Sequence, residues 1–160
     1  GKGKTTAAIG LAIRAAGAGL KVFIAQFLKR GKYSEIKTLH KFSDLISIEQ
    51  YGLGRFIKGE PKQDEVDAAQ AGLERLEIVL RSGKYDLIII EEGNVATACG
   101  LIDIKRLLDL MAAKPNEMEL VITGRDAAPA IMEAADLVTE MIEIKHYYQK
   151  GVTARRGIEK

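Results

Sequence analysis

Short apolar runs alternate with amphipathic stretches along the chain. The apolar runs have the composition of strands buried on both faces, and they predict strands over residues 21–27, 45–50, 84–92, 117–122 and 137–144. The stretches between them predict helices over residues 5–16, 34–42, 64–81, 103–111 and 127–135. This alternation predicts an α/β fold in which helices cover both faces of a mostly parallel sheet. The strand over 137–144 is mixed in polarity and is expected at an edge.

The first six residues carry the strongest chemical signal. They read Gly1-Lys2-Gly3-Lys4-Thr5-Thr6 and lead directly into the first predicted helix, as the end of a phosphate-binding loop does. Backbone N–H groups and the helix N-terminus bind anions, Lys4 adds a positive charge, and the Thr5 hydroxyl can hold Mg²⁺. Gly1, Lys2, Gly3 and Thr6 complete the expected nucleotide site. Alternatively, these residues are only a Gly- and Lys-rich loop or a frayed terminus that binds no phosphate.

This loop narrows the α/β prediction to a P-loop NTPase-like domain, a RecA- or Rossmann-like three-layer sandwich. A complete loop has a further glycine upstream of Gly3, and a strand comes before it. We therefore expect residues 1–160 to form a single P-loop nucleotide-binding domain that lacks its first strand at the N-terminus.

A second chemical feature ends the strand predicted over residues 84–92. Four consecutive branched apolar residues are followed by Glu91 and Glu92. In phosphate-loop proteins a carboxylate at this place holds Mg²⁺ opposite the loop hydroxyl. The usual order is Asp then Glu, so the sequence leaves open which of the two glutamates meets the metal. Alternatively, the acids end the strand only because they meet solvent.

Polar residues also follow other predicted strands. The loop over residues 28–34 contains Lys29, and it belongs either to the ligand crevice at the carboxyl edge of the sheet or to a solvated basic turn. The segment over 51–61 is either a mobile flap or a plain connection. Arg125 follows the strand over 117–122; it either reaches a phosphate or pairs structurally with Asp126 or Glu92.

Composition restricts the expected partners. The chain has 24 Lys and Arg residues against 22 Asp and Glu, so its charge gives no reason to expect nucleic acid or a membrane. The tail over residues 145–157 is basic and aromatic, but the rest of the chain has no basic excess, and His146 is expected to be structural. Cys99 is the single cysteine, which fits a reducing compartment and a cytoplasmic location.

The sequence resembles the ATP:corrinoid adenosyltransferases, or cob(I)alamin adenosyltransferases, of the branch built on a phosphate-loop domain. The similar stretches run nearly from end to end. They comprise residues 1–8 with Arg14 and Ala15, 21–29, the acidic strand with Asn94, 119–125, 134–141 and 145–159. The most specific stretch is Glu-Leu-Val-Ile-Thr-Gly-Arg over residues 119–125.

The resemblance implies transfer of the 5′-deoxyadenosyl group of ATP to the Co(I) centre of a reduced corrinoid, with release of triphosphate. Because Co(I) is a strong nucleophile, the protein's expected work is positioning and charge stabilisation. Lys4 would offset the charge on the leaving triphosphate, aided by Mg²⁺ held by Thr5 and Glu92, with Glu91 in support. Lys4 and Glu92 are thus the expected catalytic residues.

The resemblance also implies a corrinoid-binding region, which corresponds here to Gly54, Arg55 and Phe56. The family's aromatic pair at this place is reduced to Phe56, with Ile57 beside it. Family members commonly form homodimers, and a reductase or flavoprotein is a further expected partner. Two rival functions stay open: a P-loop NTPase or kinase, and a nucleotide-dependent corrinoid-binding module without turnover.

Overall fold

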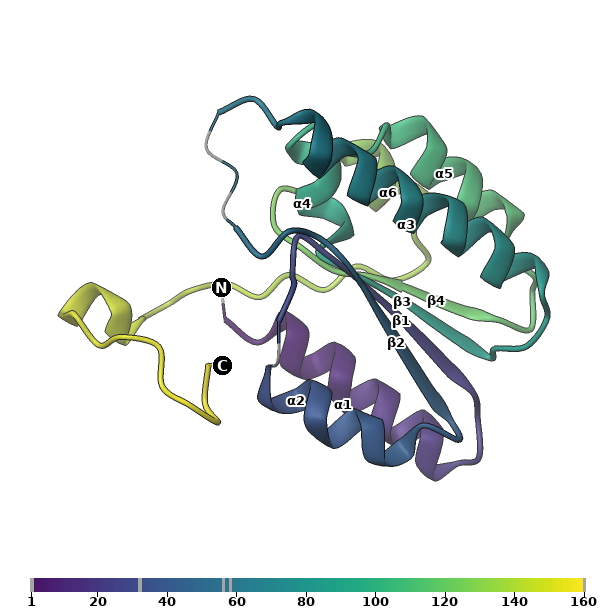
Figure 1. Cartoon of the computed structure of the whole chain (residues 1–160), viewed down its shortest axis with the longest axis horizontal. Helices are drawn as coiled ribbons and strands as arrows, with labels where there is room; N and C mark the ends of the chain where they lie inside the picture. Colours follow the sequence, from purple (N-terminus) through teal and green to yellow (C-terminus); the bar gives the residue numbers. More distant parts are fainter. Residues whose placement is uncertain (1, 32, 56, 58, 160) are drawn as a thin grey trace.

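The computed structural model describes residues 2–31, 33–55, 57 and 59–159, and a parallel sheet lies at its centre (Figure 1). Its strands are β1 (Val22–Phe27), β2 (Ile46–Tyr51), β3 (Leu87–Glu91) and β4 (Glu119–Ile122). The strands lie in the order β2-β1-β3-β4, and every neighbouring pair is parallel. The predicted parallel sheet is therefore confirmed, and the carboxyl ends of its strands share one edge.

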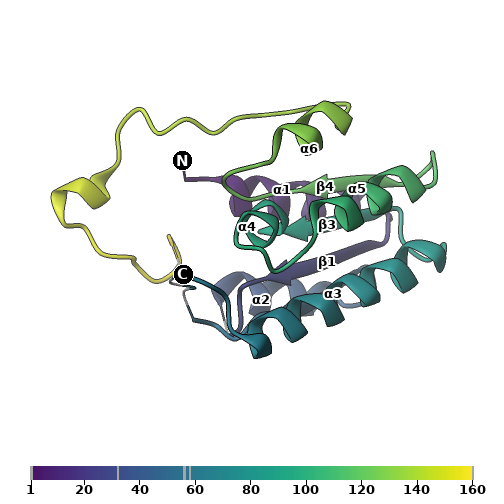
Figure 2. The ribbon, with the colours of Figure 1, turned by 90° about the horizontal axis from the view of Figure 1, so that it is seen from above.

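Helices cover both faces of this sheet (Figures 1 and 2). One face carries α1 (Lys4–Gly17) and α2 (Ser34–Leu39). The other carries α3 (Gln63–Arg81), α4 (Gly93–Ala98), α5 (Ile104–Ala113) and α6 (Pro129–Ala134). Among the described residues there are also two 3₁₀ turns, η1 (His40–Phe42) and η2 (Tyr147–Lys150). The three layers confirm the α/β prediction and are consistent with a P-loop NTPase-like sandwich. Within the described ranges, no helix has both the length and the apolar character needed to cross a membrane.

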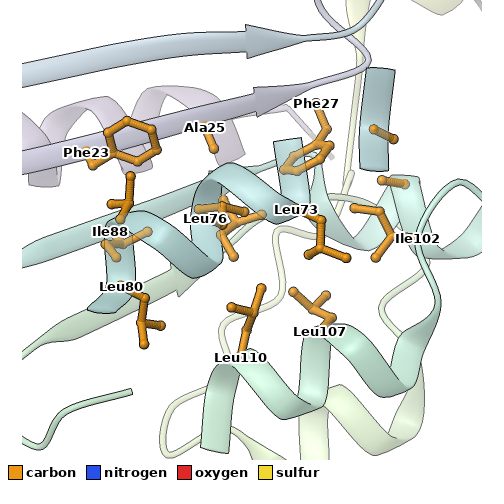
Figure 3. Close-up of a cluster of buried hydrophobic side chains, with 14 of the residues drawn as sticks. Phe23, Ala25, Phe27, Leu73, Leu76, Leu80, Ile88, Ile102, Leu107 and Leu110 are labelled. Atoms are coloured by element: carbon orange, nitrogen blue, oxygen red, sulfur yellow. The ribbon is translucent and has the colours of Figure 1, made fainter. Parts of the chain in front are cut away.

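Two apolar clusters fill the space on either side of the sheet, because successive residues of a strand point to opposite faces. Phe23 and Phe27 of β1 face the α3 and α5 side, where Leu73 and Leu107 are fully buried (Figure 3). On the other side Ile24 belongs to a cluster with four small residues of α1, namely Ala8, Ala12, Ala15 and Ala16. These packed faces fix the start of α1 relative to the strand ends.

The prediction of a strand over residues 137–144 is wrong. This segment leaves α6 and runs outside the sheet toward η2 (Figure 1). Leu137 is 83% exposed and Ile144 is 94% exposed. Apolar and β-branched composition favours a strand only where a neighbouring strand is available, and this segment pairs with none of the described strands.

Helix α4 was not predicted from the sequence. A left-handed turn at Glu92, with φ 59°, ends β3 and leads directly into this helix. Its six residues are too few to show a helical period of apolar positions. Asp103 caps the following helix, α5, because its carboxylate accepts from the backbone N–H of Lys105 at 2.8 Å.

Candidate functional site

The phosphate-loop segment (residues 1–6) leads into α1 at the carboxyl edge of the sheet. Helix α1 begins at Lys4, and Gly3 precedes it with a left-handed φ of 114°. The backbone N–H of Ala7 donates to the carbonyl of Gly3 at 2.8 Å. Lys4 and Thr5 are half-buried and Thr6 is exposed, whereas Gly1 lies outside the described residues. The nucleotide-binding roles of this segment remain predictions.

Glu91, the last residue of β3, is the centre of the polar contacts at this edge. Its side chain is 2% exposed. The Thr5 hydroxyl donates to its Oε1, and Lys29 Nζ donates to the same oxygen at 2.6 Å. Lys29 Nζ also donates to Thr5 Oγ1 at 3.2 Å, and Gln26 Nε2 donates to Glu91 Oε2. Both oxygens of the buried carboxylate are therefore partnered, as a charge removed from water requires.

Two glutamines extend this network across the sheet. Gln26 of β1 is the register partner of both Gln50 in β2 and Glu91 in β3. Gln50 Nε2 donates to Gln26 Oε1 at 3.0 Å, and the backbone N–H of Gly31 donates to Gln50 Oε1 at 3.1 Å. Because each amide oxygen already accepts a hydrogen bond, the Gln26 amide is oriented with its N–H toward Glu91.

The turn after β1 (residues 28–31) directs Lys29 back toward β3. Leu28 has a left-handed φ of 61°. Gly52, which follows β2, lies against this turn: a Cβ at Gly52 would come 2.7 Å from Leu28 Cα and 2.6 Å from the backbone nitrogen of Lys29. A Cβ at Gly54 would come 2.8 Å from the carbonyl oxygen of Arg30. These contacts and the Lys29–Glu91 ion pair support the ligand-crevice interpretation of this turn.

Glu92 lies just after β3 and has a different backbone conformation from Glu91. Its left-handed backbone places it at the N-cap of α4, where its backbone N–H donates to Thr123 Oγ1 at 3.2 Å and its side chain is half-buried. The loop hydroxyl of Thr5 contacts Glu91. Geometry therefore favours Glu91 as the carboxylate opposite the phosphate loop, while the metal-binding and catalytic roles of Glu92 remain predictions.

Asn94 presents an unused acceptor close to these acids. The residue is 7% exposed, and its Oδ1 has no hydrogen-bond partner among the described residues. Gly124 packs against it so closely that a Cβ would lie 2.9 Å from Asn94 Cβ. A buried unpaired acceptor costs free energy unless a ligand or water satisfies it. Asn94 Oδ1 is thus a buried acceptor that needs a water molecule or a local rearrangement to be satisfied.

Arg125 lies in the turn that follows β4 and is exposed. Within the described part of the chain it forms no ion pair with Asp126 or Glu92, the alternative structural partners. Asp126 beside it has a left-handed φ of 57°. The phosphate-binding role of Arg125 remains a prediction.

The predicted corrinoid-binding residues lie beside the same edge. Arg55 is fixed against the start of α3: its Nη2 lies 2.6 Å from Asp64 Oδ1, and its Nε lies 2.7 Å from Glu65 Oε1. The hydrogen bond to Glu65 is the main cause of a raised pKa for Arg55, and Arg55 in turn lowers the pKa of both acids. Phe56 lies outside the described residues. The corrinoid-binding role of Gly54, Arg55 and Phe56 remains a prediction.

Lys2 connects the phosphate-loop segment to the C-terminal segment. Its Nζ lies 2.8 Å from Glu159 Oε1 and also contacts the hydroxyl of Tyr147. Arg155 Nη2 lies 3.0 Å from the same oxygen of Glu159. Hydrogen bonds from Arg155 first, and then from Lys2 and Tyr147, lower the pKa of Glu159. The Nδ1 atom of His146 accepts from the Tyr148 backbone N–H at 3.0 Å, as a hydrogen-bonded structural histidine would, and its structural role remains a prediction.

Thr5 and Glu91 are the residues whose geometry fits a cation. Their hydroxyl and carboxylate oxygens share the Lys29 ammonium, and oxygen ligands of this kind are those that Mg²⁺ prefers. Among the described residues, no group of three His, Cys, Asp or Glu side chains could hold a metal ion. A Mg²⁺ ion here would therefore take its remaining ligands from phosphate and water.

Sequence reasoning missed Gln26 and gave Lys29 no specific partner. The signal for Gln26 was a single amide in an otherwise apolar strand, since a polar side chain at such a place needs a buried partner. The link between Lys2 and Glu159 carried no local signal, because it joins the two ends of the chain.

Comparison with known proteins agrees with the family resemblance seen in the sequence. Residues 1–159 match the family model described as "ATP:corrinoid adenosyltransferase BtuR/CobO/CobP". A corrinoid adenosyltransferase of Pseudomonas aeruginosa is 33% identical over 160 residues, which covers 99% of this chain and 79% of that protein. A corrinoid adenosyltransferase of Sinorhizobium sp is 31% identical over 99% of this chain and 76% of that protein. One of Escherichia coli (strain K12) is 28% identical over 99% of this chain and 81% of that protein.

Proposed function

The chain belongs to the ATP:corrinoid adenosyltransferase family, and from this premise we propose that it transfers the 5′-deoxyadenosyl group of ATP to the Co(I) centre of a reduced corrinoid. The products are an adenosylated corrinoid and inorganic triphosphate. The match over residues 1–159 is the observation that carries this assignment. The hydroxyl, carboxylate and lysine that meet at the start of α1 support it, because they suit a polyphosphate with its cation.

The reaction is a displacement at carbon. The electron pair of Co(I) forms the bond to C5′ of ATP, and the C5′–O bond breaks with its electron pair leaving on the triphosphate. The protein supplies no base for this step; it aligns the two substrates and offsets the charge that develops on the leaving group. Lys4 and the backbone N–H groups of the phosphate-loop segment lie at the N-terminus of α1, where we propose that they offset the charge of the triphosphate.

We assign Mg²⁺ to the position between Thr5 and Glu91. The Lys29 ammonium, shared by both side chains, is a stand-in that supports the fit of a cation there. When bound, Mg²⁺ would neutralise part of the triphosphate charge as it leaves. This assignment exchanges the roles expected from the sequence: Glu92, at the half-buried start of α4, becomes the supporting carboxylate in place of Glu91. Gly1, Lys2, Gly3, Thr6 and Arg125 complete the proposed nucleotide contacts.

The corrinoid is proposed to bind beside the segment that follows β2, at Gly54, Arg55 and Phe56. A small cavity of about 10 Å³ lies under this segment, and its lining combines the apolar side chains of Leu28, Leu53 and Ile57 with Arg55 and Glu65. A macrocycle would therefore have to bind over this segment and not inside the cavity.

Four further assignments belong to the same proposal. Residues 1–160 form one nucleotide-binding domain, the enzyme acts as a homodimer, and a reductase or flavoprotein supplies Co(I). Its location is the cytoplasm, where ATP and reducing conditions are available to a chain with a single cysteine.

The test combines the protein with ATP, Mg²⁺ and chemically reduced cobalamin. A light-sensitive adenosylated corrinoid is the expected product. Formation of ADP would favour an NTPase or kinase, and bound but unconverted corrinoid would favour a binding module. Lys4→Ala removes one charged contact to the leaving group, so its rate is expected to fall about a hundredfold, which corresponds to about 3 kcal/mol of barrier. A Lys4→Ala variant with the full rate at limiting ATP would overturn the assignment of the phosphate loop.

A further inference from the structure

The ammonium of Lys29 lies where a metal ion would have to bind. Its Nζ is 2.6 Å from Glu91 Oε1 and 3.2 Å from Thr5 Oγ1. These are the two oxygens that geometry favours for Mg²⁺. A lysine ammonium and a divalent cation compete for this position, because two positive charges so close to the same oxygens repel each other strongly.

The position of Lys29 is set by structure on several sides. Its side chain is 21% exposed, so it is largely removed from the water that weakens surface ion pairs. The left-handed turn at Leu28 and the backbone of Gly52 fix the point from which it extends. The hydrogen bond from Gly31 to Gln50 holds the other end of the same turn. Lys29 is thus a positioned group of the site.

We propose that Lys29 is a tethered counter-ion that occupies the cation position of the nucleotide-free enzyme and exchanges with Mg²⁺ when Mg·ATP binds. This inference rests on the proposed function, because that function supplies the metal and the nucleotide. Lys29 is a positioning residue: it holds the Glu91 carboxylate and the Thr5 hydroxyl in the arrangement that the metal later uses. Once displaced, its charge stays on the turn beside the phosphate-loop segment, where the triphosphate is expected.

The exchange would make metal binding depend on the nucleotide. Free Mg²⁺ or Mn²⁺ must displace an ion pair that already neutralises Glu91, so it binds the nucleotide-free protein weakly. Metal that arrives with ATP brings phosphate oxygens as additional ligands, and the released ammonium gains a phosphate partner. The protein would therefore admit the metal together with its nucleotide.

The test measures Mn²⁺ binding to the protein without nucleotide or corrinoid, from the decrease of the free Mn²⁺ signal in electron paramagnetic resonance. Lys29→Met removes the competing ammonium and keeps most of the side-chain volume. We expect it to bind Mn²⁺ at least about tenfold more tightly than the wild type. Lys29→Arg, which keeps the charge, should bind as weakly as the wild type. Lys105→Met is the matched control, since it removes a lysine from the exposed Lys105–Asp109 pair on α5, and it should change nothing.

Unchanged or weaker Mn²⁺ binding by Lys29→Met would overturn the proposal, and so would tighter binding that persists in Lys29→Met/Glu91→Gln. Should Lys29→Met fold poorly with Glu91 unpaired, Lys29→Gln keeps a hydrogen-bond donor for that carboxylate and tests the same gain. The readout needs no turnover. A wild type that makes no adenosylated corrinoid, with variants that gain Mn²⁺ affinity, would contradict the proposed function alone. Normal turnover without that gain would contradict the exchange alone.

Discussion

Replacing Glu91 by glutamine keeps the shape of the side chain but removes one of its two good acceptors. The three groups around Glu91 all donate to it: the Thr5 hydroxyl, the Lys29 ammonium and the Gln26 amide. A glutamine offers one acceptor oxygen and turns an NH₂ group toward a donor. The Gln26 amide cannot flip to compensate, since its oxygen accepts from Gln50, which in turn accepts from Gly31.

The cost follows from these contacts. The substitution removes the attraction between Glu91 and the largely buried Lys29 and leaves at least one buried donor unsatisfied. Each loss is worth about 1–3 kcal/mol, so we expect the free energy of unfolding to fall by about 3 kcal/mol. For a chain of this length, 1 kcal/mol shifts the melting temperature by roughly 2–4 °C, so Glu91→Gln should melt roughly 6–12 °C lower.

The assay is thermal unfolding followed by circular dichroism, with EDTA present so that stray metal ions do not contribute. Glu77→Gln is the matched control. Glu77 pairs with Arg106, but their side chains are 35% and 37% exposed, so its loss should cost less than about 1 kcal/mol. Equal melting temperatures for Glu91→Gln and the wild type, or a loss no larger than that of Glu77→Gln, would refute the buried network.

Three further predictions concern packing and charge. Gly72→Ala should destabilise the protein by about 1–3 kcal/mol in urea unfolding, because a Cβ there would come 2.8 Å from Tyr51 Cβ. Gly10→Ala, where the space is open, should instead stabilise α1 by about 0.5–1 kcal/mol. Equal effects of the two substitutions would contradict this packing. Gly52→Ala should displace the turn after β1, and it should lower the transferase kcat by a larger factor than any loss of folded protein explains. Unaltered kcat and KM would contradict the link between that turn and the site. The hydrogen bond from Arg55 lowers the pKa of Asp64, so the contribution of this pair is present above the ordinary pKa of an aspartate and is lost as pH falls through the lowered value. Limited proteolysis of residues 53–61 should therefore accelerate in acid for the wild type, whereas Arg55→Gln should be cleaved quickly at neutral pH already; identical pH profiles would contradict the role of the pair.

Elements with strong local signals were predictable from sequence. The amphipathic pattern predicted a helix over residues 64–81; on its apolar face Ala69, Leu73, Leu76 and Leu80 are buried, whereas Val66 is half-buried. The buried run of β3 and the Gly-Lys-Thr start of α1 were equally visible. In each case the neighbours along the chain decide the structure, so a single sequence contains the information.

Features that depend on contacts between distant segments were not predictable. The strand expected over residues 137–144 has a suitable composition, but strand formation needs a partner that sequence alone does not identify. The choice between Glu91 and Glu92 depends on the left-handed turn at Glu92, and the role of Lys29 depends on how Gly52 packs against its turn. Such contacts are set by the assembled sheet.

Displacement at C5′ is tested most directly by identifying the phosphorus product of ATP in the presence of Mg²⁺ and cob(I)alamin by ³¹P nuclear magnetic resonance. Attack at carbon predicts inorganic triphosphate in equal amount to adenosylcobalamin, and no product when cobalt is left oxidised. Accumulation of ADP and phosphate with cobalamin unchanged would contradict it, because attack would then occur at phosphorus and not at carbon.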